Sequence, residues 1–410
     1  MNNSKTRIAL ATSTIFAAAA LVACGGGGSS PAPTPTPPPS PAMGTLSASL
    51  TDAPACGFDA VNVTVSKVRV HTSGSASDTE SGWTDITLSP ARKINLLNLT
   101  NGTLDLLGTT SLPAGKYNQV RLVLDPNTGI GLANSVVPSG STTELGLDTP
   151  SAVQSGLKLN GEFEVVGGAR TDIVIDFDAC KSIVTKGKDR YALKPVVKLI
   201  PAVLNGISGV VAPALLTSKV MVSAQQNGVV IASTVPSATG EFTLARLPAG
   251  NYDVVITADG RAATVIGAVP VATATTKVAL STTAAPITMP VSQTGSIGGT
   301  VKLAPVSATE VATVSARQTF GTGSTVTIKY ANADLTTGAY TLAGLPLAAP
   351  QYAPYSATLP LVFSSVGVVT PGVAKYTVSA AATAYAARTF ATPVDVTTAN
   401  ATSVNFDLVP

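Results

Sequence analysis

Apolar side chains occur at every second position in many short runs between residues 45 and 201. Leu46, Ala48 and Leu50 alternate with polar residues, and a period of two recurs at 61–65, 120–124 and 173–177. This alternation is typical of strands that bury one face. The phase slips by one residue between Val65 and Val68, which predicts a β-bulge. The pattern predicts an all-β domain, interrupted only at 88–108, where we expect a strand, a turn and one short helix.

One short phrase recurs along the chain. It is written LPAGKY at 112–117, LPAGNY at 247–252 and, in a looser form, LPLAAPQY at 345–352. Pro248 and Pro346 are 98 residues apart, as are Gly240 and Gly338, which indicates an internal duplication. We predict two β-sandwich modules, at 205–293 and 294–410. We interpret the phrase as a hairpin turn: Leu-Pro ends one strand, glycine gives the turn its backbone freedom, and Tyr252 begins the partner strand.

Composition supports many short strands and excludes some partners. Only 11% of the 410 residues are charged, and the net charge is +3 with no basic stripe. Nucleic acid is therefore not an expected partner. His71 is the only histidine, and it has no serine or cysteine nucleophile and acid in a catalytic pattern around it. We predict no catalysis and no cofactor; a hydrolase with converging carboxylates is the third-ranked alternative.

The first 23 residues are interpreted as a signal peptide. Lys5 and Arg7 precede an apolar run, and LVAC at 21–24 resembles the bacterial lipobox, in which Cys24 is lipidated. The alternatives are a plain secretory signal and a short membrane helix. Gly25 after the cysteine favours the outer membrane, by resemblance to lipoprotein sorting. Residues 24–44 then form a disordered Gly- and Pro-rich linker. We expect a protein attached to the cell envelope through its lipid.

Two cysteines remain after Cys24. In an oxidising compartment Cys56 and Cys180 form an even pair, which predicts a disulfide. The alternative is two free or metal-binding thiols. A weak calcium hypothesis rests on aspartates of the same domain, chiefly Asp52, Asp176 and Asp178, since hard cations take several carboxylate oxygens. The other interpretation of Asp176 and Asp178 is the solvated face of a strand.

Segments of the sequence resemble two known families. LSASLTDAP (46–54), FDAVNVTVSKVRVH (58–71) and TDIVIDFDACKS (171–182) resemble, in this order, a bacterial lipoprotein domain of unknown function numbered 4382. The resemblance covers 45–201 and implies no activity. TGEFTLARLPAGNYDV (239–254) resembles the carboxypeptidase regulatory-like module. That family implies a transthyretin-like β-sandwich, grouped with carbohydrate-binding-like folds.

We therefore expect a lipid-anchored envelope protein with a structural, adhesive or ligand-presenting role. The alternative is a carbohydrate-binding or envelope-assembly partner, with envelope glycans or another envelope protein as the partner. Sugar recognition needs exposed aromatic rings. Tyr352 and Tyr355, in the proline-rich stretch APQYAPYSATLP, are the weak candidates, and we predict a rigid loop there. Their other interpretation is that they cover the module's own core. Phe242 and Tyr252 are assigned to the core of the middle module.

Overall fold

The computed structural model describes residues 41–410 except 55–56, 129–130, 160, 202–204, 273–275, 321–322 and 366–368. The predicted signal peptide, Cys24, most of the linker and Cys56 lie outside the described residues. Residues 41–410 form one compact unit. It is all-β, as predicted, with only short helical turns: η1 (Leu96–Leu99), α1 (Pro150–Gln154), α2 (Ala179–Ser182) and η2 (Pro213–Ser218). Among the described residues, no helix has the length and apolar character needed to span a membrane.

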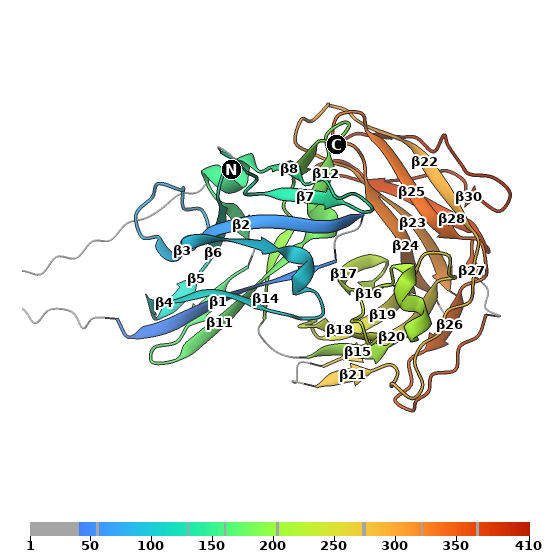
Figure 1. Ribbon diagram of the computed structural model, residues 1–410, viewed down its shortest axis with the longest axis horizontal. Helices are drawn as coiled ribbons and strands as arrows, with labels where there is room; N and C mark the ends of the chain where they lie inside the picture. Colours follow the sequence, from blue (N-terminus) through green and yellow to red (C-terminus); the bar gives the residue numbers. More distant parts are fainter. Residues whose placement is uncertain are drawn as a thin grey trace, which may run out of the picture. The chain divides into compact units, whose positions relative to one another are not determined.

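The first domain packs two sheets against one another (Figure 1). One sheet has the order β14-β11-β1-β4, and the other has the order β12-β13-β8-β7-β2-β6-β9, with β3 beside β2. Alternate residues such as Leu46, Leu50 and Val63 have no exposed surface and fill the space between the sheets. The strands are β1 (Met43–Ala53), β2 (Phe58–His71), β3 (Thr84–Asn95), β4 (Asp105–Pro113), β5 (Gly115–Tyr117), β6 (Gln119–Leu124), β7 (Ser135–Pro138), β8 (Leu145–Asp148), β9 (Leu157–Leu159), β10 (Phe163–Val165), β11 (Arg170–Asp178), β12 (Ile183–Thr185), β13 (Tyr191–Leu193) and β14 (Val197–Pro201).

Two local predictions for this domain are confirmed. The pairing of β2 with both β3 and β6 shifts register between Val65 and Lys67, at the place where the apolar pattern slips. The segment 88–108 contains the end of β3, the single 3-10 turn η1 and the start of β4. Asn95 caps this turn, because its side-chain oxygen accepts a hydrogen bond from Leu97 N.

The middle module is a two-sheet sandwich with its own core. Its small sheet has the order β18-β15-β21, and its large sheet has the order β17-β16-β19-β20-β26. Phe242 and Tyr252 are buried between the sheets, as predicted. The strands are β15 (Gly206–Val210), β16 (Met221–Gln226), β17 (Val229–Thr234), β18 (Glu241–Ala245), β19 (Gly250–Thr257), β20 (Thr264–Val271) and β21 (Lys277–Ala279).

The last module repeats this arrangement. Strand β22 pairs antiparallel with β25 and parallel with β31, as β15 pairs with β18 and β21. The second sheet has the order β24-β23-β28-β29, with β27 and β30 beside it. The strands are β22 (Thr294–Leu303), β23 (Thr313–Phe320), β24 (Ser324–Asn332), β25 (Ala339–Pro346), β27 (Val369–Thr370), β28 (Lys375–Ala381), β29 (Arg388–Thr389), β30 (Val394–Asp395) and β31 (Phe406–Leu408).

The interpretation of the repeated phrase as a hairpin turn is wrong. Strand β18 lies in the small sheet of the middle module and β19 in the large one, so the phrase carries the chain from one sheet to the other. Gly250 has φ +154° at this crossing, and Gly115 has φ +148° in the first domain. Tyr252 enters the core between the sheets, and its hydroxyl donates to Pro248 O at 2.6 Å. The phrase is therefore a corner closed by its own tyrosine.

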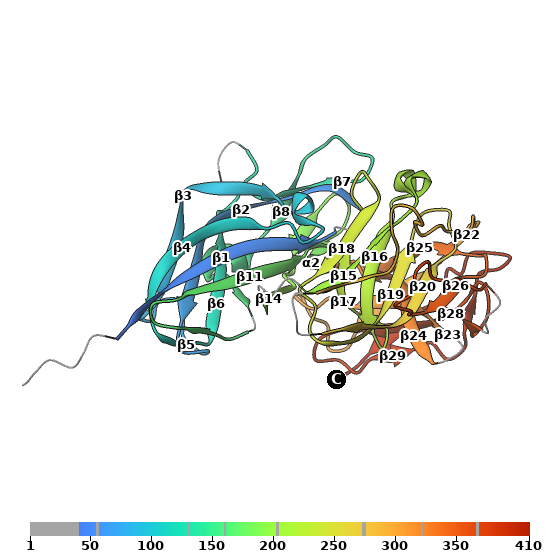
Figure 2. The same cartoon turned by 90° about the horizontal axis from the view of Figure 1, so that it is seen from below.

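The duplicated modules differ by an insertion after this corner. Strand β28 occupies the place of β19, and Tyr376 the place of Tyr252, although these tyrosines are 124 residues apart and the prolines only 98. The inserted residues include β26 (Gln351–Pro354), which pairs parallel with β20 of the middle module. Figures 1 and 2 both show β26 beside β20. The predicted loop is thus wrong for 351–354, which form an edge strand of the neighbouring sheet, whereas residues 355–360 contain no strand.

Candidate functional site

The first domain covers the edge of β17 with two lysines. Lys181 Nζ donates to Val230 O at 3.1 Å, and Lys198 Nζ donates to Ile231 O at 2.7 Å. Successive carbonyls of a regular strand point to opposite sides. Here the β16–β17 register skips Ile231, which makes it a bulge residue. The bulge explains how two consecutive carbonyls both accept hydrogen bonds from the same domain.

Asp176 and Asp178 hold these lysines in place. Lys181 Nζ lies 2.9 Å from Asp178 Oδ2, and Lys198 Nζ lies 3.5 Å from Asp176 Oδ2. Burial raises the pKa of Asp176, and the charge of Lys198 opposes that rise. The interpretation of a solvated face is wrong for Asp178, which is buried. Its surroundings include another module, which the sequence pattern does not reveal.

The three calcium candidates line one small cavity between the first domain and the middle module, but they come from two faces of the sheet. In the parallel pairing of β1 with β11, Asp176 is opposite Thr51 and Asp178 is opposite Ala53, whereas Asp52 is opposite Phe177. Because side chains alternate between faces, Asp52 belongs to the other face of the sheet. Its Oδ1 accepts a hydrogen bond from Ala179 N at 3.1 Å. Among the described residues, no group of three or more acidic, histidine or cysteine side chains is placed to hold a metal ion.

Lys181 is the point at which all three modules meet. Its ammonium group binds the middle module through Val230 and lies 5.9 Å from the ring centroid of Tyr330 in the last module. Its carbonyl oxygen accepts a hydrogen bond from Asn332 Nδ2 at 3.0 Å. The short helix α2 carries Lys181, and Asp178 caps that helix by accepting from Lys181 N. Cys180 lies in the same helix; because Cys56 is not among the described residues, their disulfide stays a prediction.

A second contact joins the first domain to the middle module. The side-chain oxygen of Asn101 accepts hydrogen bonds from Thr234 Oγ1 at 2.9 Å and from Thr243 N at 3.1 Å. Arg246 is buried beside it and donates to Gly102 O at 3.2 Å. Burial lowers the pKa of Arg246, an effect that the charge of Asp176 opposes. This contact places another three polar side chains at the junction of the modules.

Asp334 fastens the last module to the first domain. Its Oδ2 accepts from Gly187 N at 2.9 Å, and its Oδ1 accepts from Thr337 N at 2.8 Å. Burial alone would raise the pKa of Asp334, but these backbone hydrogen bonds outweigh it and lower the pKa to about 2. Lys194 and Glu310 form an ion pair of 2.7 Å across the same boundary. The carboxylates at this boundary therefore serve as structural acceptors.

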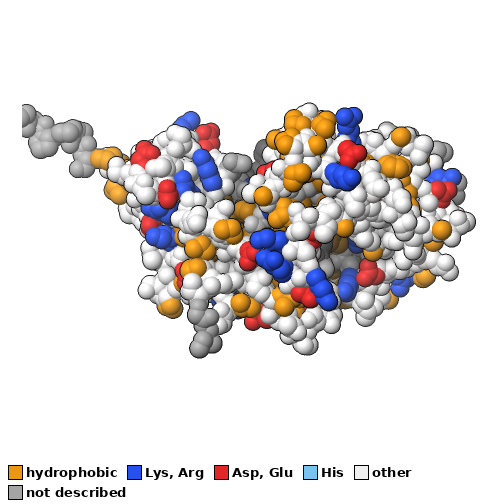
Figure 3. Space-filling model, turned by 90° about the horizontal axis from the view of Figure 1, so that it is seen from above, with side chains coloured by type: hydrophobic (Ala, Val, Ile, Leu, Met, Phe, Trp, Pro, Cys, Tyr) orange, Lys and Arg blue, Asp and Glu red, His pale blue; other side chains and the backbone are white. Residues whose placement is uncertain are grey.

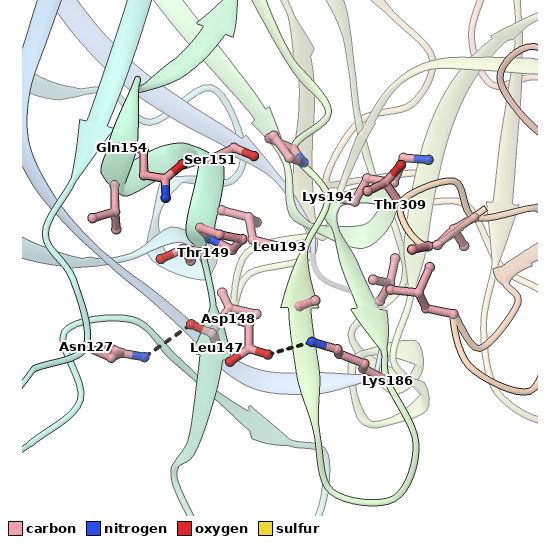
Figure 4. Close-up of a pocket in the computed structure, with 18 of the residues that line it drawn as sticks. Asn127, Leu147, Asp148, Thr149, Ser151, Gln154, Lys186, Leu193, Lys194 and Thr309 are labelled. Carbon is pink, nitrogen blue, oxygen red and sulfur yellow. Dashed lines mark hydrogen bonds and ion pairs between the residues drawn. The ribbon is translucent and has the colours of Figure 1, made fainter.

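A groove of about 760 Å³ lies between the first domain and residues 308–311 and 335 of the last module. Figure 4 shows Asp148 joined to Lys186 at one end of the groove and Gln154 toward the other end. Both acidic residues of the lining are paired with lysines, Asp148 with Lys186 at 3.2 Å and Glu310 with Lys194. No aromatic side chain lines it. The groove has the size of a ligand site, but it presents neither paired carboxylates for hydrolysis nor a ring for stacking on a sugar.

His71 has a structural role. Ser73 N donates to Nδ1 at 2.9 Å, so Nε2 carries the proton and donates to Ser81 O at 3.0 Å. The ring lies 5.0 Å from that of Trp83, the only tryptophan of the chain. The guanidinium carbons of Arg69 and Arg121 each lie 4.8 Å from the centroid of the Trp83 ring. These contacts fix the loop at 72–83 on the sheet and engage both ring nitrogens of His71 with backbone groups.

Tyr352 and Tyr355 are both partly buried in packing contacts. The Tyr352 ring stacks on Phe320 of the last module with a centroid separation of 5.8 Å. Tyr355 packs against the core of the middle module. The structure thus directs the two rings to different cores and does not bring them together as one sugar-binding face. This arrangement favours the alternative that the rings cover core residues.

The visible surface agrees with the absence of a basic stripe. Figure 3 shows lysine and arginine side chains scattered over one face, many of them beside acidic residues. Ten ion pairs connect the described residues, among them Arg92–Asp105 at 2.6 Å and Lys93–Glu144 at 2.7 Å. A mixed surface of this kind has no strong single-sign field to attract a polyanion.

Comparison with known sequences assigns one part of the chain. Residues 43–195 match the sequence model of a family described as "Domain of unknown function (DUF4382)". This match confirms the resemblance of the first domain and covers less than half of the chain. No curated protein matches the chain. Neither result indicates an enzyme family.

Solved structures match most of the chain at low similarity. The Bacillus anthracis TIE protein is 10% identical over 89% of this chain and 50% of its own, with a TM-score of 0.17. The Corynebacterium diphtheriae major pilin SpaA is 12% identical over 90% and 100%, with a TM-score of 0.18. BcpA, the major pilin subunit of Bacillus cereus, is 11% identical over 90% and 98%, with a TM-score of 0.12. This chain thus spans half the length of the TIE protein, and such scores support no functional conclusion.

Proposed function

We propose that this protein is a lipid-anchored component of the bacterial cell envelope, with a structural, adhesive or ligand-presenting role and no catalysis. The anchor rests on the lipobox-like LVAC at 21–24 and the proline-rich linker that follows it. Two or more acyl chains on Cys24 are sufficient for stable membrane attachment. The linker then separates the β-rich body from the lipid surface. Gly25 favours the outer membrane as the location.

One observation carries the structural role. The ionisable and amide groups between the modules, such as Lys181, Asp334 and Asn101, are partly buried and are all engaged in contacts that hold one module to the next. Domains that share only a small, polar interface generally move relative to one another. Here hydrogen bonds link each module to the other two. They support a rigid body that keeps its groove in a fixed geometry.

The anchor is tested in cells of the source organism or a related host. Wild-type protein should incorporate radiolabelled palmitate and fractionate with the envelope, whereas Cys24→Ala should do neither. Ser30→Ala is the matched control, because it changes a linker residue outside the lipobox and leaves Cys56 and Cys180 intact. Incorporation of palmitate by the Cys24→Ala variant would contradict the anchor.

The role of the body is tested with the folded part of the chain. Residues 41–410 are applied to a glycan array and, separately, to envelope extracts for chemical cross-linking. Thr309→Trp fills the groove, and Thr142→Trp adds the same ring to an exposed position outside the groove lining. A partner whose capture is lost only in Thr309→Trp would place ligand presentation in the groove. Glycan binding unaffected by that variant would favour the carbohydrate-binding alternative at another surface, and turnover of a glycan would contradict the proposal.

A further inference from the structure

The insertion of the last module contains a segment that behaves like a bound peptide. We call residues 351–365 the strap. Within it, β26 pairs with β20 over only four positions, from Thr264 opposite Gln351 to Gly267 opposite Pro354. The strap contains no charged residue, so no ion pair fastens it. It is held by backbone hydrogen bonds, by apolar contacts and by the side chain of Gln351, whose Nε2 donates to Thr264 Oγ1 at 2.8 Å. Sheet edges recognise extended peptides through the same kinds of contact.

The edge of β20 is shaped for this occupant. Gln351 N donates to Ala263 O, and Tyr355 N donates to Gly267 O, each at 2.9 Å. The Tyr352 ring lies directly on Gly267, where any side chain would overlap the ring, since a Cβ there would be 3.0 Å from Cε2 of the tyrosine. Ala353, which follows Tyr352 in β26, is only 1% exposed. The site is thus defined by Gly267, which leaves room for the tyrosine ring, by the buried Ala353, and by the carbonyl oxygens of Ala263 and Gly267.

The strap also supplies apolar side chains that the middle module lacks. Tyr355, Leu361 and Phe363 all pack on the core of that module, although they belong to the sequence of the next one. The last module does not need the strap to complete its own sheets, because β22, β25 and β31 and β23, β24 and β28 reproduce the middle module without it. Acceptor and occupant therefore belong to different modules, and the occupant is an addition to the duplicated unit.

We propose that the edge of β20 is a strand-binding site. It binds the strap of its own chain, and it can exchange this strap for the strap of a second copy of this chain. Within one chain the local concentration of the strap is high, so the intramolecular form dominates in dilute solution. When the strap leaves, the same contacts accept the identical segment of another molecule, which joins the two copies by exchange of an element. The site extends beyond the proposed envelope role and does not depend on lipid attachment.

The prolines of the strap are consistent with such exchange. Pro350, Pro354 and Pro360 restrict the backbone, and two hydrogen bonds between Tyr352 and Ser364 close the segment into a loop, so less conformational entropy is lost when it binds. Pro354 has no N–H, but the N–H groups that face β20 are those of alternate residues, as Gln351 and Tyr355 show. The prolines therefore permit pairing with β20 while preventing a longer regular strand.

The test uses the full chain and a fluorescent peptide of residues 347–365. The Tyr352→Ala/Tyr355→Ala variant weakens the strap and should bind the peptide saturably, at least tenfold tighter than wild type, whose site is filled. Adding Gly267→Val to that variant should reduce peptide binding at least tenfold, because valine occupies the space of the tyrosine ring. Adding Gly74→Ala instead is the matched control, since a Cβ at Gly74 makes only an ordinary contact at 3.5 Å. Circular dichroism confirms that each variant is folded.

Hydrogen exchange at residues 351–355 decides the remaining outcomes. The proposal would be overturned if the strap is released and the protein still does not bind the peptide. It would also be overturned if Gly267→Val leaves peptide binding unchanged. If the double variant keeps its strap protected, Ala353→Asp provides a second route, because a buried carboxylate without a partner expels the segment. Peptide binding by that variant is then expected, and its absence is equally decisive. Differently tagged copies carrying an intact Gly267 should also co-purify after mixing at high concentration.

Discussion

The hydroxyl of Tyr376 donates a hydrogen bond of 2.6 Å to the carbonyl oxygen of Pro346, 30 residues earlier in the chain. In the other two copies of the corner the tyrosine is four residues after its proline: Tyr252 donates to Pro248 O, and Tyr117 donates to Pro113 O at 3.1 Å. The inserted residues of the last module have separated the two partners in sequence without separating them in space. The bond between tyrosine and proline is thus the feature that all three corners keep.

Tyr376→Phe should destabilise the last module measurably. The change removes a buried donor and leaves Pro346 O without its partner, which costs about 1–3 kcal/mol. Burial also raises the pKa of Tyr376, so the hydroxyl stays protonated as a donor throughout the neutral range. Urea unfolding followed by circular dichroism measures the change. Tyr385→Phe is the control, because its hydroxyl bond to Pro305 O is exposed and should contribute only a few tenths of a kcal/mol; equal losses in the two variants would contradict the structural role of the corner.

Asp334 should make the protein sensitive to acid between about pH 4 and pH 2. Burial would raise the pKa of its carboxyl, but the hydrogen bonds from Gly187 N and Thr337 N lower it to about 2. An unfolded aspartate has a pKa of about 3.9. Because the folded pKa is the lower of the two, the carboxylate stabilises the protein above about pH 4, and this contribution is lost as the pH falls through about 2.

The measurement is unfolding free energy against pH in wild type and Asp334→Asn. The asparagine variant should be less stable at pH 7, by about 1–3 kcal/mol, and should lose less stability on acidification than wild type. Asp407→Asn, which changes an exposed aspartate of the same module, should follow the wild-type curve. A wild-type slope that persists in Asp334→Asn would show that other carboxylates carry the acid sensitivity.

Lys181→Met should loosen the contact between the first domain and β17. The methionine keeps the apolar stem but removes the charge, which leaves the buried Asp178 without its ion pair and Val230 O without its donor. Leaving a hydrogen-bonding group of this kind without its partner costs about 1–3 kcal/mol. Hydrogen–deuterium exchange should increase in Val229–Thr234, while Lys188→Met, at an exposed position nearby, should leave it unchanged. If hydrogen exchange in β17 is the same in both variants, Lys181 does not hold this strand.

Cys56 and Cys180 should be linked in protein isolated from the envelope. The register of β1 with β11 places Ala53 opposite Asp178, and Ala179 N donates to Asp52 Oδ1, so the chain reaches the neighbourhood of Cys180 three residues before Cys56. Mass spectrometry of a non-reduced digest is expected to contain the cross-linked peptides. Closing a loop of this length stabilises a domain by about 4–5 kcal/mol in the chain-entropy model. Both thiols alkylated in freshly isolated protein would refute the bridge.

The strands of the first domain were predictable because their signal is local. Burial of one face imposes alternation on Leu46, Ala48 and Leu50, and a bulge shifts that alternation where it occurs, at Val65. The duplication was predictable for the same reason, since a repeated corner repeats its sequence. Which sheet a strand joins is a long-range property. Proline and glycine occur both in hairpin turns and in corners, so the phrase around Pro248 does not distinguish them.

The residues that join the modules were not predictable from the sequence around them. Asp176 and Asp178 alternate with apolar residues as a solvated face does, and only the presence of β17 shows that they hold Lys198 and Lys181. The prolines around Tyr352 argue for a loop and against a central strand, but β26 is an edge strand, which pairs through alternate N–H groups. In both cases the missing information was the identity of the neighbouring module.

Trp83, with Arg69 and Arg121 against its ring, gives the first domain a spectroscopic label of its own. Because the chain has one tryptophan, its intrinsic fluorescence at the red edge of excitation reports on this domain alone, whereas far-ultraviolet circular dichroism reports on every sheet. If the inter-module contacts make the body a single cooperative unit, the two signals will change together during unfolding. A fluorescence transition that precedes or follows the dichroism transition would instead assign the first domain a folding equilibrium of its own.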